Sequence, residues 1–149
     1  MHISCANIDD LEALAGLFDA YRVFYGQESD PPRAHAFLKD RLERGESTIF
    51  IARLDDGTAA GFTQLYPLFS SVSTGRVWLL NDLYVASSAR RTGTGAALLA
   101  AAREFARSTG ALRIELATAH GNTAAQALYE REGYVVDTEF RRYSLNTKG

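Results

Sequence analysis

The residue types and spacing most suited to chemistry lie in the segment "ARRTGTGAALL", residues 89–99. Arg90 and Arg91 are followed by Gly93 and Gly95, and then by an alanine-rich pattern typical of a helix. Backbone N–H groups at the start of a helix lack helical partners, and the helix dipole favours negative charge there. Glycines let a ligand approach the backbone closely. The segment therefore predicts a site for a phosphate or pyrophosphate.

Two familiar phosphate-binding motifs do not fit this turn. The phosphate loop of nucleotide hydrolases needs a lysine and then serine or threonine after its second glycine, where Ala96 and Ala97 stand. The dinucleotide fingerprint needs a third small residue where Leu98 stands, and a position early in the chain. The pattern that remains is Arg-x-x-Gly-x-Gly after a strand.

A second segment, "NTAAQALYEREGY" at residues 122–134, follows about thirty residues later. Together the two segments resemble the signatures of the GNAT superfamily of acetyl-coenzyme A-dependent N-acetyltransferases, and the order of the expected elements is similar over nearly the whole chain. The resemblance implies an enzyme that uses acetyl-coenzyme A as co-substrate, without a metal. It also implies a homodimer.

The resemblance implies a role for each matching position. Backbone groups at Leu83, Tyr84 and Val85 would bind the pantetheine arm and the acetyl carbonyl, and the Val85 N–H would donate to that carbonyl oxygen. The Tyr129 hydroxyl would reach the sulfur and protonate the leaving thiolate, although Tyr129 beside Leu128 could also be a core residue. The complete set expected to bind the coenzyme is Leu83, Tyr84, Val85, Arg90, Arg91, Thr92, Gly93, Thr94, Gly95, Ala96, Asn122 and Tyr129.

Asn81 and Asp82 interrupt an otherwise apolar strand pattern, "VWLLNDLYV". A polar pair inside a central strand is costly unless it is hydrogen-bonded or functional. Alternation would place the two side chains on opposite faces unless a β-bulge intervenes. The segment 65–85 is similar to the diamine branch of the superfamily, in which a glutamate precedes the aspartate. Since Asn81 cannot accept a proton, Asp82, directly or through water, is the expected general base.

The segment "YRVFYGQESD", residues 21–30, lies where the resemblance places the acceptor pocket. Tyr21, Tyr25, Glu28 and Asp30 could hold a cationic amine by cation–π contact and charge. The amphipathic pattern of a helix explains Tyr21 and Tyr25 equally well. The expected acceptor is a small primary amine, polyamine or amino-acid-like amine. The alternatives are acetylation of protein lysines or N-termini, and an acyl-coenzyme A-binding module without catalysis.

Hydrophobic periodicity indicates the elements that would position these residues. Helices are expected from Asp9, from the prolines at 31–32, and over 94–108 and 122–133; strands are expected over 2–5, 47–54, 58–67, 76–85 and 112–118, with one or two closing strands in 134–145. The fold class is α/β (α+β). We expect a single domain over residues 1–149, with a mixed, mostly antiparallel sheet of six to seven strands flanked by about four helices.

Composition limits the remaining possibilities. Residues 1–60 carry a net charge of −5 and residues 61–149 a net charge of +3, without the basic cluster that nucleic-acid binding requires. No apolar run approaches the roughly 20 residues of a membrane helix, and no leader pattern is present. Cys5 is the only cysteine, and His2, His35 and His120 are scattered. These features predict a cytoplasmic protein with no membrane partner and no metal site.

Overall fold

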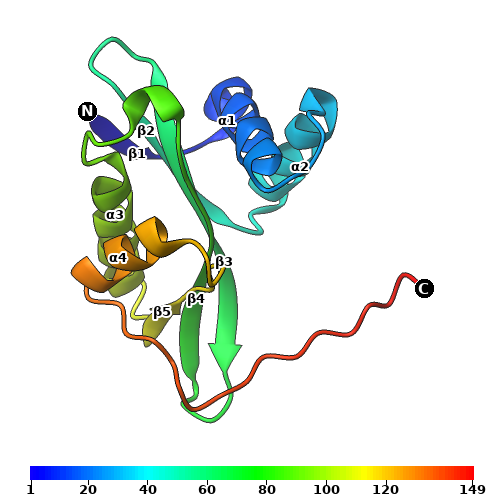
Figure 1. Ribbon diagram of the computed structural model, residues 1–149, viewed down its shortest axis with the longest axis vertical. Helices are drawn as coiled ribbons and strands as arrows, with labels where there is room; N and C mark the ends of the chain where they lie inside the picture. Colours follow the sequence, from blue (N-terminus) through cyan, green and yellow to red (C-terminus); the bar gives the residue numbers. More distant parts are fainter. The chain divides into compact units, whose positions relative to one another are not determined.

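The computed structural model describes residues 1–149, which divide into two compact units, Met1–Ala117 and Thr118–Gly149 (Figure 1). The first unit contains β1 (His2–Cys5), the short 3-10 helix η1 (Ile8–Asp10), α1 (Leu11–Phe24), α2 (Pro31–Arg44), β2 (Thr48–Arg53), β3 (Ala59–Ser70), β4 (Gly75–Val85), η2 (Ser87–Ala89), α3 (Thr94–Ser108) and β5 (Arg113–Glu115). The second unit contains α4 (Thr123–Arg131). None of the helices combines the length and apolar character needed to span a bilayer.

The ends of the helices follow local sequence signals. The Asp30 side chain accepts a hydrogen bond from the Arg33 N–H, and two prolines form the first turn of α2. Gly45, with φ of 61°, ends that helix in the left-handed region. Helix α3 begins after Gly93, which has φ of 81°, and it spans the predicted residues 94–108.

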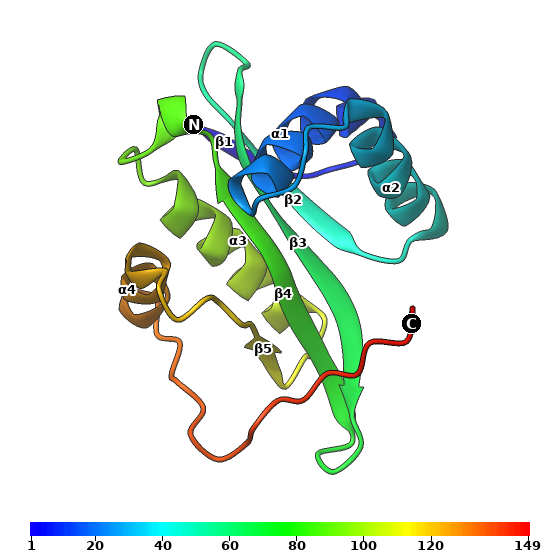
Figure 2. The ribbon, with the colours of Figure 1, turned by 45° about the vertical axis from the view of Figure 1, so that its right-hand side comes forward.

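The five strands form one sheet in the order β1-β2-β3-β4-β5 (Figure 2). The pairs β1–β2, β2–β3 and β3–β4 are antiparallel, whereas β4 and β5 are parallel. A parallel neighbour requires a crossover connection, which η2 and α3 provide between β4 and β5. The predicted mixed, mostly antiparallel sheet is confirmed.

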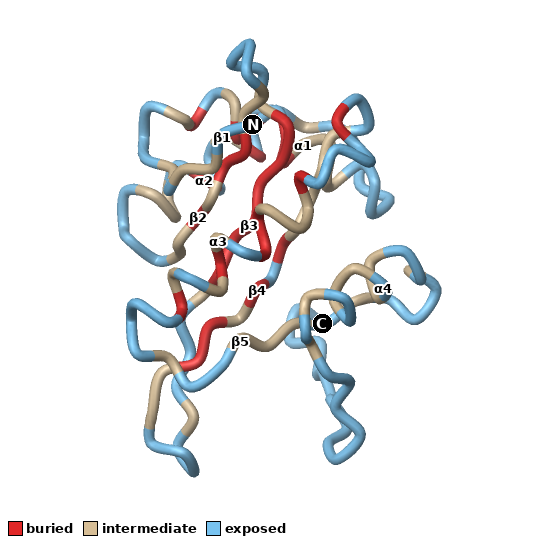
Figure 3. The backbone as a smooth tube through the Cα atoms, turned by 90° about the vertical axis from the view of Figure 1, so that its left-hand side faces the viewer, coloured by how far each residue is buried: buried red, intermediate tan, exposed pale blue.

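The core lies on both faces of this sheet, because successive strand residues point to opposite sides. On one face, Ile51 and Phe62 pack in a cluster with α1 and α2 that includes Leu14 and Leu38. On the other face, Ala52 and Ala60 pack against Leu98 of α3. Figure 3 shows buried residues concentrated along β3.

The number of strands differs from the prediction. The sheet has five strands rather than six or seven, because residues 134–145 form none of the expected closing strands. The apolar side chains of this segment are exposed, with Val135 at 92% and Tyr143 at 85%. Apolar alternation favours an extended chain, but a strand exists only where a neighbour completes its hydrogen bonds. The number of helices and the α/β class are as predicted, and a single domain over 1–149 stays a prediction.

Candidate functional site: an open strand edge, a glycine turn and a buried carboxylate

The glycine turn connects β4 to α3 and has the backbone of an anion site. Arg91 and Gly93 both lie in the left-handed region, with φ of 64° and 81°. No side chain caps the N-terminus of α3, so its first N–H groups have no side-chain acceptor. The Thr92 hydroxyl donates to the Ala89 carbonyl and is hydrogen-bonded to the Thr94 hydroxyl, which holds the turn in place. The turn therefore has open backbone donors for an anion, and pyrophosphate binding there stays a prediction.

The two arginines of the turn differ in their contacts. Arg90 Nε donates to the Val85 carbonyl at 3.3 Å, and its guanidinium lies 5.7 Å from the centre of the Phe24 ring. Arg90 therefore connects the turn to both β4 and α1. Arg91 is exposed at the tip of the turn, next to the open N-terminus of α3.

The C-terminal half of β4 has an unpaired edge. Pairing with β5 covers Val77 to Leu79 only, whereas pairing with β3 continues to Val85. The Ala86 N–H donates to the Ala60 carbonyl on the β3 side. Since alternate residues direct their N–H groups to opposite edges, the N–H groups of Leu83 and Val85 point to the open edge. A coenzyme arm can therefore add to β4 as a strand would, at the residues predicted from the sequence.

A β-bulge in β4 brings Asn81 and Asp82 together. Gln64 pairs with Asp82 and Leu65 pairs with Leu80, so Asn81 is an extra residue in β4. The Asn81 amide donates to one Asp82 carboxylate oxygen at 3.1 Å. Asp82 is buried at 4% exposure, whereas Asn81 is exposed. Because of the bulge, the two neighbouring side chains do not have to point to opposite faces of the sheet. Asn81 can therefore donate a hydrogen bond to the Asp82 carboxylate.

Asp82 is held by polar groups from several elements. The Gln64 amide donates to its second carboxylate oxygen at 2.7 Å, and the Ser47 hydroxyl donates to the Gln64 carbonyl oxygen at 2.7 Å. Burial raises the pKa of Asp82, and hydrogen bonds from Gln64, Tyr21 and Asn81 oppose that rise. Burial and the Asp82 charge raise the pKa of Tyr66 to about 12. Asp82 is therefore a buried carboxylate with an elevated proton affinity, as a general base requires.

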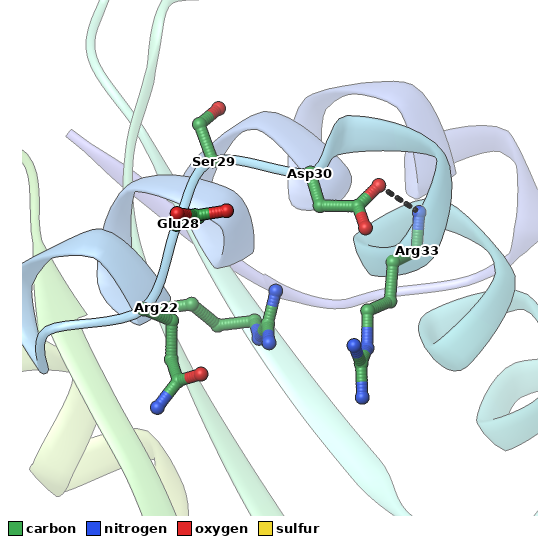
Figure 4. Close-up of a pocket in the computed structure, with 6 residues that line it drawn as sticks. Arg22, Glu28, Ser29, Asp30 and Arg33 are labelled. Atoms are coloured by element: carbon green, nitrogen blue, oxygen red, sulfur yellow. Dashed lines mark hydrogen bonds between the residues drawn. The ribbon is translucent and has the colours of Figure 1, made fainter.

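The structure separates the residues predicted for the acceptor. Tyr21 of α1 reaches Asp82 and packs edge-on against Phe62 and Tyr84. Tyr25 is half exposed and packs on Tyr21. A pocket between the end of α1 and the start of α2 is lined by Glu28 and Asp30, together with Arg22, Gln27, Ser29 and Arg33 (Figure 4). The two tyrosines do not line this pocket, and the binding of an amine by these residues stays a prediction.

Asn122 and Tyr129 belong to the second unit. Asn122 caps α4, since its side-chain oxygen accepts a hydrogen bond from the Ala125 N–H at 3.3 Å. Tyr129 is half-buried on α4, with its ring 5.8 Å from that of Tyr134. The cap gives Asn122 a structural role that the sequence reading did not assign. The contacts of both residues with the coenzyme stay predictions.

Sequence reasoning missed the partners of Asp82. Thr63 and Gln64 are fully buried polar residues in the central strand β3, and the Thr63 hydroxyl donates to the Asp82 carbonyl at 2.8 Å. The signal was present, because "GFTQLY" contains the same interruption of an apolar strand that singled out Asn81 and Asp82. Ser47 carried no such signal, since it precedes a strand where polar residues are common.

Comparisons with known proteins agree with this geometry. The sequence profile described as the acetyltransferase (GNAT) family matches residues 14–134. The chain is 51% identical over 146 residues to the uncharacterized N-acetyltransferase YhfO of Bacillus subtilis (strain 168), covering 98% of this chain and 97% of that protein. It is 33% identical over 107 residues to aminoglycoside N(6')-acetyltransferase type 1 of Klebsiella aerogenes, covering 70% of each.

A solved structure agrees with the fold over its full length. The crystal structure of a "probable acetyltransferase" has a TM-score of 0.95 and 45% identity, covering 100% of this chain and 99% of that one. The enzyme class predicted from the glycine turn and the α4 segment is thereby confirmed. The chain belongs to the acetyltransferase (GNAT) family.

Proposed function

We propose that this enzyme transfers the acetyl group of acetyl-coenzyme A directly to a small primary amine within a ternary complex. The observation that carries the proposal is the position of Asp82. The buried carboxylate lies on β4 next to Leu83, within the stretch of that strand whose edge is unpaired. A proton acceptor and a row of backbone donors are therefore adjacent on one strand.

Each group of the chain has a defined task in this proposal. Acetyl-coenzyme A, when bound, supplies an activated thioester. The uncapped N-terminus of α3 and the backbone at 91–96 hold the pyrophosphate, and the open edge of β4 holds the arm. The Val85 N–H donates to the acetyl carbonyl oxygen and stabilises the charge that develops there.

The protons are handled by two side chains. Asp82 accepts a proton from the ammonium group of the acceptor, so that the neutral amine can attack. Asn81, Gln64 and Tyr21 position that carboxylate. The Tyr129 hydroxyl protonates the departing thiolate, and the second proton of the attacking nitrogen returns to Tyr129 as the amide forms. Partial desolvation of the Cys5 thiol on β1 and the nearby Asp10 charge raise its pKa, which does not favour a cysteine-bound acyl intermediate.

The test is thiol release from acetyl-coenzyme A in the presence of a panel of primary amines, with product identification by mass spectrometry. We expect saturable release that depends on both substrates, with intersecting double-reciprocal lines, as a ternary complex requires. Coenzyme binding without turnover on any small amine or lysine peptide would refute the enzyme proposal. Turnover on lysine peptides but on no small amine would indicate that the acceptor is a protein.

A further inference from the structure

The pocket between α1 and α2 contains two arginines, one from each helix. Arg22 lies near the end of α1 and Arg33 in the first turn of α2, and Figure 4 shows both guanidinium groups on the same side of the connecting loop. The pocket has a volume of about 280 Å³, and both arginines also line an adjoining hollow with Phe18 and Phe37. The arginines therefore separate a polar compartment from an apolar one.

Neither guanidinium forms an ion pair at contact distance, although the charge of Arg22 acts on Asp19. Arg22 Nη1 is buried and has no hydrogen-bond partner. No carboxylate lies within 4.0 Å of either group, whereas Arg41 pairs with Glu46 and Arg53 pairs with Asp10 at 3.0 Å each. A buried N–H without an acceptor costs free energy that a bound anion would recover. The arrangement of two donors from two helices suits the planar, bidentate recognition of a carboxylate.

The acidic residues nearby limit which anion the pocket accepts. Glu28 and Asp30 line the same pocket, so its formal charge balances. Asp30 already accepts from the Arg33 N–H, and Asp19 accepts from the Ser29 hydroxyl and the Asp30 N–H, so hydrogen bonds anchor the connecting loop at both helices. A dianion such as a phosphate would be repelled by the two carboxylates. A singly charged carboxylate is the group that fits.

The apolar compartment is linked to the proposed proton acceptor by two aromatic side chains of α1. The Phe18 ring lines that compartment and stacks on the Tyr21 ring at a centroid distance of 6.0 Å. Tyr21 in turn hydrogen-bonds Asp82. The stacked rings of Phe18 and Tyr21 therefore connect the hollow to the carboxylate.

We propose that the acceptor amine carries a carboxylate, which Arg22 and Arg33 bind while the apolar chain of the acceptor lies against Phe18 and Phe37. This inference rests on the proposed acetyltransferase function and names its substrate class. Amino-acid-like amines satisfy it. Purely cationic acceptors, such as polyamines and aminoglycosides, leave the Arg22 guanidinium unpaired.

The first test compares two acceptors that differ in one group, 4-aminobutanoate and 4-aminobutanamide, and extends the comparison to shorter and longer members of each series. We expect kcat/KM to favour the carboxylate by about 10- to 100-fold, the range for a hydrogen bond to a charged group. Arg22→Gln and Arg33→Gln should abolish this preference through KM, with kcat nearly unchanged. Arg44→Gln, an exposed change on α2 outside the pocket, should keep it.

Equal kcat/KM for acid and amide throughout the series would overturn the inference, as would a preference that survives in both pocket variants. Arg33 is exposed, so its replacement should leave folding intact even if the Arg22 variant is unstable. Thermal unfolding of each variant establishes that its fold is retained.

The second test does not depend on turnover. Butanoate, which has no amine, is titrated into the wild-type protein and the three variants by calorimetry and by NMR. Butanoate binding that is lost in the Arg22 and Arg33 variants but kept in Arg44→Gln supports the carboxylate pocket. If no amine is acetylated at the same time, only the proposed function fails. Turnover of cationic amines together with no detectable butanoate binding refutes the carboxylate pocket and leaves the enzyme proposal standing.

Discussion

Replacing Asp82 by asparagine should separate the catalytic role of this residue from its structural role. The side chain keeps its shape, and one of its two oxygens still accepts a hydrogen bond. The other oxygen is replaced by an NH2 group, which then faces a neighbouring N–H donor. That donor is Gln64 Nε2, now 2.7 Å from the carboxylate, or Asn81 Nδ2, now 3.1 Å from it. The lost bond costs about 1 kcal/mol. Removing a buried carboxylate relieves its desolvation, so the change in unfolding free energy should remain below about 2 kcal/mol.

The effect on activity should be much larger. A positioned general base contributes about 10²- to 10⁴-fold, so kcat/KM should fall by that factor while coenzyme affinity, which depends on the glycine turn, is nearly unchanged. The assay is thiol release at saturating acetyl-coenzyme A, with coenzyme binding measured by calorimetry. Asp82→Asn with wild-type kcat/KM would refute the assignment of Asp82 as proton acceptor.

The pH dependence gives an independent readout of the same residue. The wild-type kcat/KM should rise with pH through an apparent pKa above the ordinary 3.8 of an aspartate, and the variant should lack this limb. Because the folded pKa is raised, the native state binds the proton more tightly than the unfolded state. The resulting stabilisation is complete below pH 3.8 and is lost as the pH rises through the folded pKa. Urea unfolding should therefore show Asp82→Asn gaining stability relative to wild type as the pH rises, and a constant difference would contradict the raised pKa.

Two other substitutions test the coenzyme side. Tyr129→Phe should lower kcat by about 10²-fold with coenzyme binding nearly intact, since it removes only the proposed acid; unchanged turnover would exclude that role. Gly61→Ala should destabilise the fold by about 1–3 kcal/mol and weaken coenzyme binding, because the new Cβ would lie 2.6 Å from the Tyr84 carbonyl oxygen on β4. Gly16→Ala is its matched control, since nothing lies within 4 Å of that Cβ in α1, and it should stabilise by about 0.5–1 kcal/mol. The measurement is urea denaturation of both glycine variants. If their unfolding free energies change with the same sign, this interpretation of the β3–β4 contact is refuted.

The sequence by itself determined the features whose causes are local. The glycine turn was predictable because Gly93 and Gly95 at the start of a helix leave N–H groups open, and this depends only on neighbouring residues. The start of α2 at the two prolines and the bounds of α3 followed from proline chemistry and apolar periodicity. The polar interruption at Asn81 and Asp82 marked β4 as a candidate site before any neighbour was known.

Only the tertiary structure decided the features that depend on pairing between distant residues. The bulge at Asn81 exists through the register between β3 and β4, and Asp82 acquires its raised pKa from burial among elements that are far apart in the chain. The closing strands over 134–145 were wrong because apolar alternation cannot supply a hydrogen-bonding neighbour. The arginine pocket was hidden for the same reason, since Arg22 and Arg33 each read as an ordinary surface charge on a helix. Their common lack of a partner becomes visible only when α1 and α2 pack side by side.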